Sequence, residues 1–123
     1  MASYVDGFVI PIPKKNLRAY RRMARLGAKV WMEYGALAFY ECVGDDLSVR
    51  WGTGFGRLAR LKPGETAVFS WIVYKSRADR DRVNAKVMKD PRMSDPKMQK
   101  TMPFDPRRMA YGGFKVLVQG HEG

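Results

Sequence analysis

The segment FSWIVYKSRADRDR, residues 69–82, changes within fourteen positions from aromatic and β-branched residues to a run in which nearly every second residue is charged. Residues 65–74 are rich in residue types that favour strands. Ser76, followed three positions later by Asp79, resembles a capping box, in which the serine hydroxyl accepts a hydrogen bond from the third backbone N–H of a helix. We therefore predict a strand over 65–74 and a helix that begins directly after Ser76.

The chain before this segment predicts two strands and one helix. SYVDGFVIPIP (3–13) alternates as a strand does, and its prolines at 11 and 13 are expected to end it. From Lys14 to the glycine of YGA (34–36), small or apolar residues recur at the spacing of one helical face. These residues are Leu17, Tyr20, Ala24, Gly27, Ala28 and Trp31. ALAFYECVGDD (36–46) returns to period two and predicts the second strand.

The helix after Ser76 is less regular in its pattern. Helical spacing places Arg80 and Asn84 near the same face as Val83 and Val87, so we expect a polar group beneath this helix.

The remaining segments complete the pattern. Pro91 is expected to end the second helix, and Asp95 with Pro96 predicts the start of a short helix. MAYGGFKVLV (109–118) predicts the last strand, where the two glycines indicate close approach of backbone or aromatic rings. The irregular, glycine-rich connection over 47–64 is a candidate flap.

The order strand, helix, strand, strand, helix, strand predicts an α+β fold, a ferredoxin-like βαββαβ sandwich. Its antiparallel four-stranded sheet has the order 4-1-3-2 and carries both helices on one face. We expect one domain over 1–123, with a flexible tail at 119–123. The predicted strands are apolar on both faces, so the face without helices needs a cover. A second copy of the chain is the simplest cover, which predicts a homodimer.

Composition limits the class of protein. The 123 residues are 46% hydrophobic and 28% charged, as in globular domains. The apolar runs are too short to span a membrane, and the first residues lack the features of a signal peptide. A single cysteine, Cys42, and eight methionines suit a reducing compartment. We therefore expect a cytoplasmic protein that makes no membrane contact.

Four blocks in the same order along the chain carry a resemblance to a known family. They are YVDGFVIPIPKKNLRAYRRMA, ECVGDD, FSWIVYKSRADRDRVNAKVMKDPRM and MPFDPRRMAYGGFKVLV. With these blocks the chain resembles the YbaA-like family of small bacterial proteins of unknown function. The resemblance implies a dimeric α+β barrel in which two ferredoxin-like subunits face each other through their sheets. It implies no reaction and no catalytic residue.

Charged residues within strands are the first candidates for a site, because a two-layer sandwich leaves few solvated strand positions. Asp6, Glu41 and Lys115 qualify. If the first and last strands pair antiparallel, Asp6 and Lys115 are neighbours close to three tyrosines, in the space between subunits. This pair is either a structural ion pair or the polar floor of a ligand pocket. The candidates for the pocket, including an arginine suited to a substrate carboxylate, are Asp6, Trp71, Tyr74, Arg92, Tyr111 and Lys115.

Other chemistry has little support in the sequence. The only histidine, His121, lies in the terminal GHEG, and Cys42 has no neighbouring histidine to activate it. GTGFG (52–56) lacks the lysine and serine that end a phosphate-binding loop. We expect neither a metal nor a cofactor, and the sequence does not decide whether the protein is an enzyme.

The net charge of +11 offers an alternative function. Residues 14–34 contain seven basic residues and one acidic residue, a net charge of +6. Residues 75–92 contain seven basic and three acidic residues, a net charge of +4. Basic helices can neutralise phosphates, although no aromatic residues interleave with them as stacking platforms. Gel shifts at raised salt separate nucleic-acid recognition from a merely solvated face. The candidate residues are Arg18, Arg22, Arg25, Lys29, Arg80 and Lys86.

Two functions therefore follow from the sequence. The first is binding or transformation of a small molecule in a pocket of the barrel. The second is interaction with nucleic acid or protein through the basic outer helices.

Overall fold

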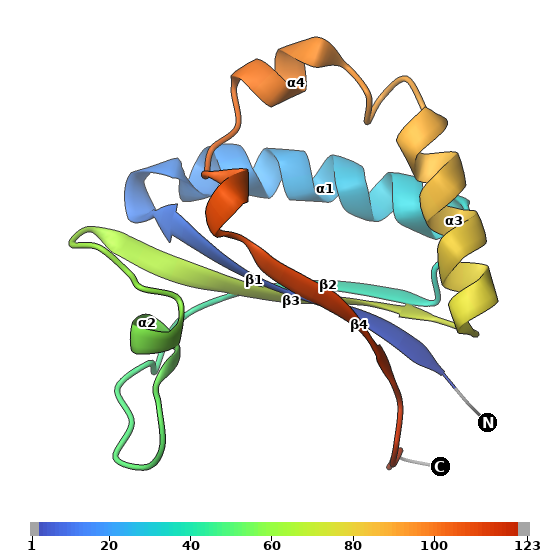
Figure 1. The fold of residues 1–123 in the computed structure, drawn as a ribbon. Coiled ribbons are helices and arrows are strands. Elements are labelled where there is room, and N and C mark those ends of the chain that lie inside the picture. Colours follow the sequence, from blue (N-terminus) through green and yellow to red (C-terminus); the bar gives the residue numbers. More distant parts are fainter. Residues whose placement is uncertain (1–2, 121–123) are drawn as a thin grey trace.

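The computed structural model describes residues 3–120 and contains one antiparallel sheet with its long helices on one face (Figure 1). The strands are β1 (Tyr4–Pro13), β2 (Ala38–Val43), β3 (Glu65–Tyr74) and β4 (Ala110–Lys115). The α-helices are α1 (Leu17–Glu33), α2 (Phe55–Leu58), α3 (Arg77–Lys89) and α4 (Pro96–Lys100). Two 3₁₀ turns, η1 (Lys14–Asn16) and η2 (Pro106–Arg108), complete the chain.

The strand order is β2-β3-β1-β4, which confirms the predicted βαββαβ arrangement and its 4-1-3-2 order. The helix signals were also correct. The Ser76 hydroxyl accepts from the Asp79 backbone N–H at 3.1 Å, and Asp95 caps α4 with Pro96 in its first turn. Gly35, which follows the C-terminal end of α1, has a φ of +116°, a conformation that favours glycine. None of the helices within residues 3–120 is long and apolar enough to cross a membrane.

Two strand boundaries differ from the prediction. β1 continues through Pro11 to Pro13, because its register with β4 ends at Val9 and the prolines lie where β1 has only β3 as a neighbour. The missing N–H groups therefore interrupt no second ladder. β4 ends at Lys115, which pairs with Tyr4 at the first residue of β1. The predicted extension of the last strand to 118 is therefore wrong.

The two faces of the sheet have different surroundings. The face toward α1 and α3 contributes alternate residues such as Ile10, Ile72 and Tyr74 to the core. The opposite face, called the outer face below, carries α2 and the connection around it (Figure 1). Phe55 of α2 packs on Phe69 of this face with ring centroids 5.8 Å apart. By register, Glu65 lies at one end of the outer face, opposite Pro13. The rest of the face, from Val5 to Val9 of β1 and across the neighbouring strands, carries twelve uncharged residues: Val5, Gly7, Val9, Ala38, Tyr40, Cys42, Phe69, Trp71, Val73, Ala110, Gly112 and Phe114.

Gly113 is expected to be intolerant of any side chain. The ring of the buried Tyr4 covers it so closely that an added Cβ would overlap the phenol, whereas a Cβ on Gly112 would meet Phe114 at 3.9 Å. Overpacking of this kind costs about 1–3 kcal/mol. Gly113→Ala is therefore expected to lower the free energy of urea unfolding by about 2 kcal/mol, and Gly112→Ala by much less. Equal effects of the two variants would contradict this contact.

Glu65 is expected to make stability fall in acid. Arg108 donates to both carboxylate oxygens at 2.7 and 2.9 Å and, with the Lys62 backbone N–H, lowers the Glu65 pKa to about 2. Because the folded pKa is depressed, this stabilisation is present above the ordinary carboxyl pKa of about 4.3 and is lost as pH falls toward 2. Glu65→Gln should therefore destabilise the protein in urea titrations at pH 7, and by about half as much or less at pH 3. A pH-independent difference would contradict the ion pair.

Candidate ligand-binding site

A cavity of about 550 Å³, called the main cavity below, lies between the helix-facing side of the sheet and the helical layer. Its walls come from β1, β2, β3, α1, α3 and the segment 93–112. Aromatic rings of Phe8, Trp31, Phe39 and Tyr111 line it. Six of the eight methionines in the sequence also line it: Met23, Met88, Met93, Met98, Met102 and Met109. Methionine is flexible and polarizable, so this wall can adapt to apolar molecules of different shapes.

The floor of the main cavity is polar around Asp6. Asp6 is 5% exposed, and Arg80 Nη1 donates to its Oδ1 at 3.0 Å. Asn84 Nδ2 donates to the other oxygen, Oδ2, at 3.3 Å. The Arg80 guanidinium also lies 4.9 Å from the centroid of the Tyr4 ring. We call Asp6, Arg80 and Asn84 the Asp6 cluster. Its hydrogen bonds join β1 to α3, and the positive charge of Arg80 compensates the negative charge of Asp6.

Two aromatic side chains fix the Asn84 amide. Its Oδ1 accepts from Trp31 Nε1 at 2.9 Å and from the Tyr74 hydroxyl at 3.1 Å. These acceptor contacts direct Nδ2 toward Asp6. Burial, together with the charge of Asp6, raises the pKa of Tyr74, so its phenol stays protonated and donates. The polar group expected beneath the second helix is therefore Asp6.

The predicted pairing of Asp6 with Lys115 is wrong. Within β4 the residue opposite Asp6 is Gly113, and the ring of Tyr4 lies over that glycine. Lys115 pairs with Tyr4 and is exposed, whereas Arg80 reaches the carboxylate from α3. The carboxylate also points to the helical layer and away from the outer face, so it does not lie in a space between facing sheets.

The other pocket candidates lie in three places. Tyr111 lines the main cavity with Asp6, and Tyr74 is fully buried beneath its floor. Trp71 lies on the outer face, where it stacks on Tyr40 with ring centroids 5.0 Å apart. The structure thus brings Asp6, Tyr74 and Tyr111 together and separates Trp71 from them.

Arg92 connects the ends of the two long helices. Its guanidinium donates to Asp90 at 2.8 and 2.9 Å and to Glu33 at 3.0 Å. These bonds, with one from the Tyr34 hydroxyl, hold the pKa of Asp90 well below its usual range. The Arg92 guanidinium, which was predicted to bind a substrate carboxylate, is therefore already bonded to two carboxylates of the chain itself.

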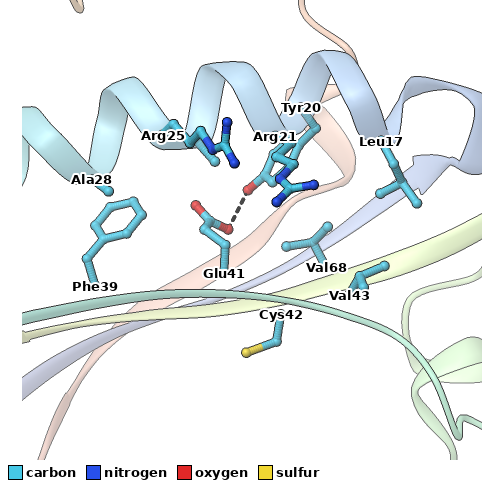
Figure 2. Close-up of a pocket in the computed structure, with 11 residues that line it drawn as sticks. Leu17, Tyr20, Arg21, Arg25, Ala28, Phe39, Glu41, Cys42, Val43 and Val68 are labelled. Atoms are coloured by element: carbon cyan, nitrogen blue, oxygen red, sulfur yellow. Dashed lines mark hydrogen bonds between the residues drawn. The ribbon is translucent and has the colours of Figure 1, made fainter.

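Glu41 forms a second polar position that sequence reasoning left outside the site. Its Oε1 accepts from the Tyr20 hydroxyl at 2.7 Å, and Figure 2 shows the carboxylate rising from β2 toward α1. Glu41 lies on the edge strand β2 and is exposed as a residue, but desolvation of its carboxylate raises its pKa. The pKa of Tyr20 is raised by burial and by the neighbouring carboxylate. The available signal was the presence of a charge within a strand.

A second hollow of about 440 Å³, called the side groove, lies between α1 and β2 (Figure 2). Its apolar lining includes Ala28 and Val43, and Arg21 and Arg25 extend from α1 at its edge. Tyr20 and Glu41 line both the side groove and the main cavity. They therefore stand in the wall that separates the two spaces.

The candidates for nucleic-acid binding do not all share one surface. Arg80 turns inward to Asp6, so its place on an outer basic face is corrected. The exposed members are Arg18, Arg22, Arg25 and Lys29 on α1 and Lys86 on α3. No ion pair of residues 3–120 includes one of these five. A nucleic-acid interface on these helices stays a prediction.

Metal and thiol chemistry have no assembled site within the described part of the chain. No group of three or more histidine, cysteine or acidic side chains in residues 3–120 is arranged to hold a metal ion. Cys42 is exposed, and Figure 2 shows its sulfur on the side of the sheet away from α1. His121 and part of the predicted tail lie outside the described residues.

Solved structures with little sequence similarity share this fold. A dimeric ferredoxin-like protein from an uncultured marine organism superimposes with a TM-score of 0.61 at 12% identity, over 99% of this chain and 100% of that one. A NIPSNAP family protein of Agrobacterium tumefaciens C58 gives a TM-score of 0.59 at 14% identity, over 98% and 89% of the two chains. These likenesses support a ferredoxin-like fold and carry no information about ligands.

Sequence comparison identifies nearer relatives. The uncharacterized protein YbaA of Escherichia coli K12 is 43% identical over 115 residues, which cover 94% of this chain and 97% of that protein. The YbaA protein of Shigella flexneri matches equally. The family model described as protein of unknown function (DUF1428) matches residues 3–106. The chain therefore belongs to this YbaA-like family, as its four sequence blocks predicted.

Proposed function

We propose that the protein binds a small, largely apolar molecule in the main cavity, with the Asp6 cluster next to the polar end of that molecule. The observation that carries this proposal is a methionine-lined cavity of about 550 Å³ with a buried, charge-compensated carboxylate at its floor. Ligand pockets in proteins have volumes of about 300–1,000 Å³ and combine apolar walls with few polar groups.

Arg80 is the group best suited to contact the ligand. It lines the main cavity, and its side chain keeps 20% exposure while its Nη1 is engaged by Asp6. Its Nη2 makes a long contact of 3.4 Å with the Tyr4 hydroxyl. This N–H group can donate to a carbonyl or hydroxyl oxygen of a ligand, because a guanidinium carries five donors.

Trp31 provides a direct readout of binding because its ring lines the main cavity. Trp51→Phe and Trp71→Phe together leave Trp31 as the only tryptophan of the three. Titration of this variant with the apolar ketone 2-indanone should give saturable quenching of fluorescence. Ala24 lines both spaces, whereas Ala28 lines only the side groove.

Two substitutions then locate the bound ketone. Ala24→Phe should fill part of the main cavity and weaken binding by about tenfold or more, since lost apolar burial costs about 1.4 kcal/mol or more. Ala28→Phe should leave the affinity nearly unchanged. Quenching that does not saturate, or that only Ala28→Phe removes, would refute binding in the main cavity.

We also infer that the protein assembles as a homodimer through its outer face. This face holds twelve strand positions without a charge, and Tyr40, Phe69 and Phe114 on it are 53%, 45% and 62% exposed. Exposed apolar area of this kind favours a protein interface. The dimeric ferredoxin-like protein with the same fold supports a partner of the same kind.

A cytoplasmic location fits the same features. Cys42 is exposed on the outer face, and thioethers line the main cavity, so a reducing compartment protects both. Detection of the protein in a periplasmic or membrane fraction of lysed cells would contradict this location.

A further inference from the structure

Glu41 and Asp6 both line the main cavity, and both project from the helix-facing side of the sheet. β1 residue Phe8 pairs with Ser70 of β3, and Ser70 pairs with Glu41 of β2, so these side chains share the helix-facing side of the sheet. Asp6 lies two residues along β1 from Phe8 on the same side. With strands about 4.8 Å apart and a rise of about 3.3 Å per residue, the Cα atoms of Glu41 and Asp6 are about 10 Å apart across the sheet and about 7 Å along it. Ser70, Phe8 and Ile72 line the cavity between these two positions.

The two carboxylates differ in how their charge is compensated. Asp6 accepts from Arg80 and Asn84 through both oxygens. Glu41 accepts from the neutral Tyr20 hydroxyl, and no ion pair of residues 3–120 includes it. Glu41 is thus the carboxylate of the main cavity that keeps basicity for a ligand.

The surroundings of Glu41 set its proton affinity. Tyr20, Arg21 and Arg25 face it from α1, with Ser70 beside it on β3 and Asp6 and Arg80 across the main cavity. Glu41 is exposed as a residue of the edge strand β2, but its carboxylate is desolvated beneath α1, and this desolvation raises its pKa more than the Tyr20 hydrogen bond lowers it. A carboxyl group with a raised pKa is a stronger proton acceptor than an ordinary one and is more effective near neutral pH.

We propose that Glu41 acts as a general base on an apolar ketone held in the main cavity, with Arg80 donating to the carbonyl oxygen. Glu41 takes a proton from the carbon next to the carbonyl group. The electrons of the broken C–H bond form a carbon–carbon double bond, and the carbonyl π electrons move to the oxygen, giving an enolate. Return of a proton from Glu41 to carbon restores the ketone or shifts a double bond, so no oxidant is needed.

This assignment rests on the proposed function, because the ketone must occupy the main cavity. The placement of the two groups fits proton abstraction next to a carbonyl. A base stands on one wall, and a guanidinium that can stabilise a developing enolate stands across the cavity. Tyr20 is then a positioning residue, which holds the carboxylate in the wall between the two spaces.

Deuterium incorporation into 2-indanone from D₂O, followed by proton NMR, measures the reaction. All variants carry Trp31 as their only tryptophan, so fluorescence quenching reports binding in the same samples. The wild-type site should accelerate exchange, and Glu41→Gln should lower the protein-dependent rate by about 100-fold or more, with affinity changed by less than about threefold. Glu41→Asp keeps a carboxylate on a shorter side chain and should retain an intermediate rate.

The pH dependence of exchange separates a base from a structural carboxylate. The rate should rise with pH as Glu41 ionises, with a midpoint above the ordinary range of carboxyl groups. Tyr20→Phe should move this midpoint upward, because the lost hydrogen bond favours the ionised form. A folded, ketone-binding Glu41→Gln that exchanges as fast as the wild type would overturn the assignment of the base. Absence of saturable quenching in the wild-type site would instead overturn the proposed function, and the base with it.

Discussion

Asp6→Ala is expected to lower the free energy of unfolding by about 3 kcal/mol, the low end of the effect of breaking a buried ion pair. The substitution removes the carboxylate that Arg80 meets at the cavity floor, and it leaves the guanidinium beside Tyr4 with only the more exposed Asp81, at 2.8 Å, as a charge partner within residues 3–120. It also removes the acceptor of the Asn84 amide. The low end of the range applies because the Arg80 side chain is 20% exposed and water can relieve part of the penalty.

A double-mutant cycle with Arg80→Met measures the coupling between the two residues. Urea unfolding of Asp6→Ala, Arg80→Met and the double variant should show that the double variant is more stable than the sum of the single changes predicts. Lys115→Met serves as a control, because no ion pair of residues 3–120 joins Lys115 to Asp6. Additive effects for Arg80, or coupling to Lys115 of the same size, would contradict the Asp6 cluster.

The second large effect is expected on assembly. Light scattering at micromolar protein concentration should give about twice the chain mass of 14.1 kDa. Phe69→Lys should weaken the dimer by about 100-fold or more, because an unpaired charge would be buried at the centre of the outer face. Met32 on α1 has the same 45% exposure as Phe69, so Met32→Lys is a matched control that should stay dimeric.

The possible outcomes of this experiment lead to different conclusions. A wild-type protein that is strictly monomeric would contradict both the dimer and the barrel. A dimer that survives Phe69→Lys and dissociates with Met32→Lys would show that the helical layer forms the interface. The outer face would then have no function in assembly.

The sequence was sufficient for the fold because its local signals agree with the final packing. Ser76 and Asp95 each supply a cap that the structure uses, and the strand pattern alternates wherever one face meets the helices. The exceptions occur at the ends of strands. Proline at 11 is tolerated because of where β4 begins to pair, and no local pattern carries that information.

The candidate site was less predictable because it depends on which element reaches a given strand. Asp6 was identified as a charge within a strand, but its partner Arg80 comes from a helix and lies 74 residues later in the chain. Helical spacing did place Arg80 and Asn84 on the inner face of α3. The charge pattern, however, placed Arg80 among the outer basic residues. Only the packing of α3 on β1 decides whether Arg80 points inward or outward.

The methionine lining was equally hidden in the sequence. Four of its members, Met93, Met98, Met102 and Met109, belong to the segment between α3 and β4. Its helix α4 and turn η2 are too short for a periodicity that indicates burial. Their common function as one wall follows only from the path of this segment over α1 (Figure 1).

Methionine methyl NMR is the sharpest test of whether an apolar molecule binds in the main cavity. With ¹³C-labelled methionine methyl groups, 2-indanone should shift the signals of the six lining residues as the cavity fills, while Met32, which lies outside it, serves as the internal reference. Saturable shifts are expected for Met23, Met88 and the four methionines of the segment 93–109, and none for Met32. Shifts confined to Met32, or no saturable shift at the six lining methyl groups, would contradict binding in the main cavity.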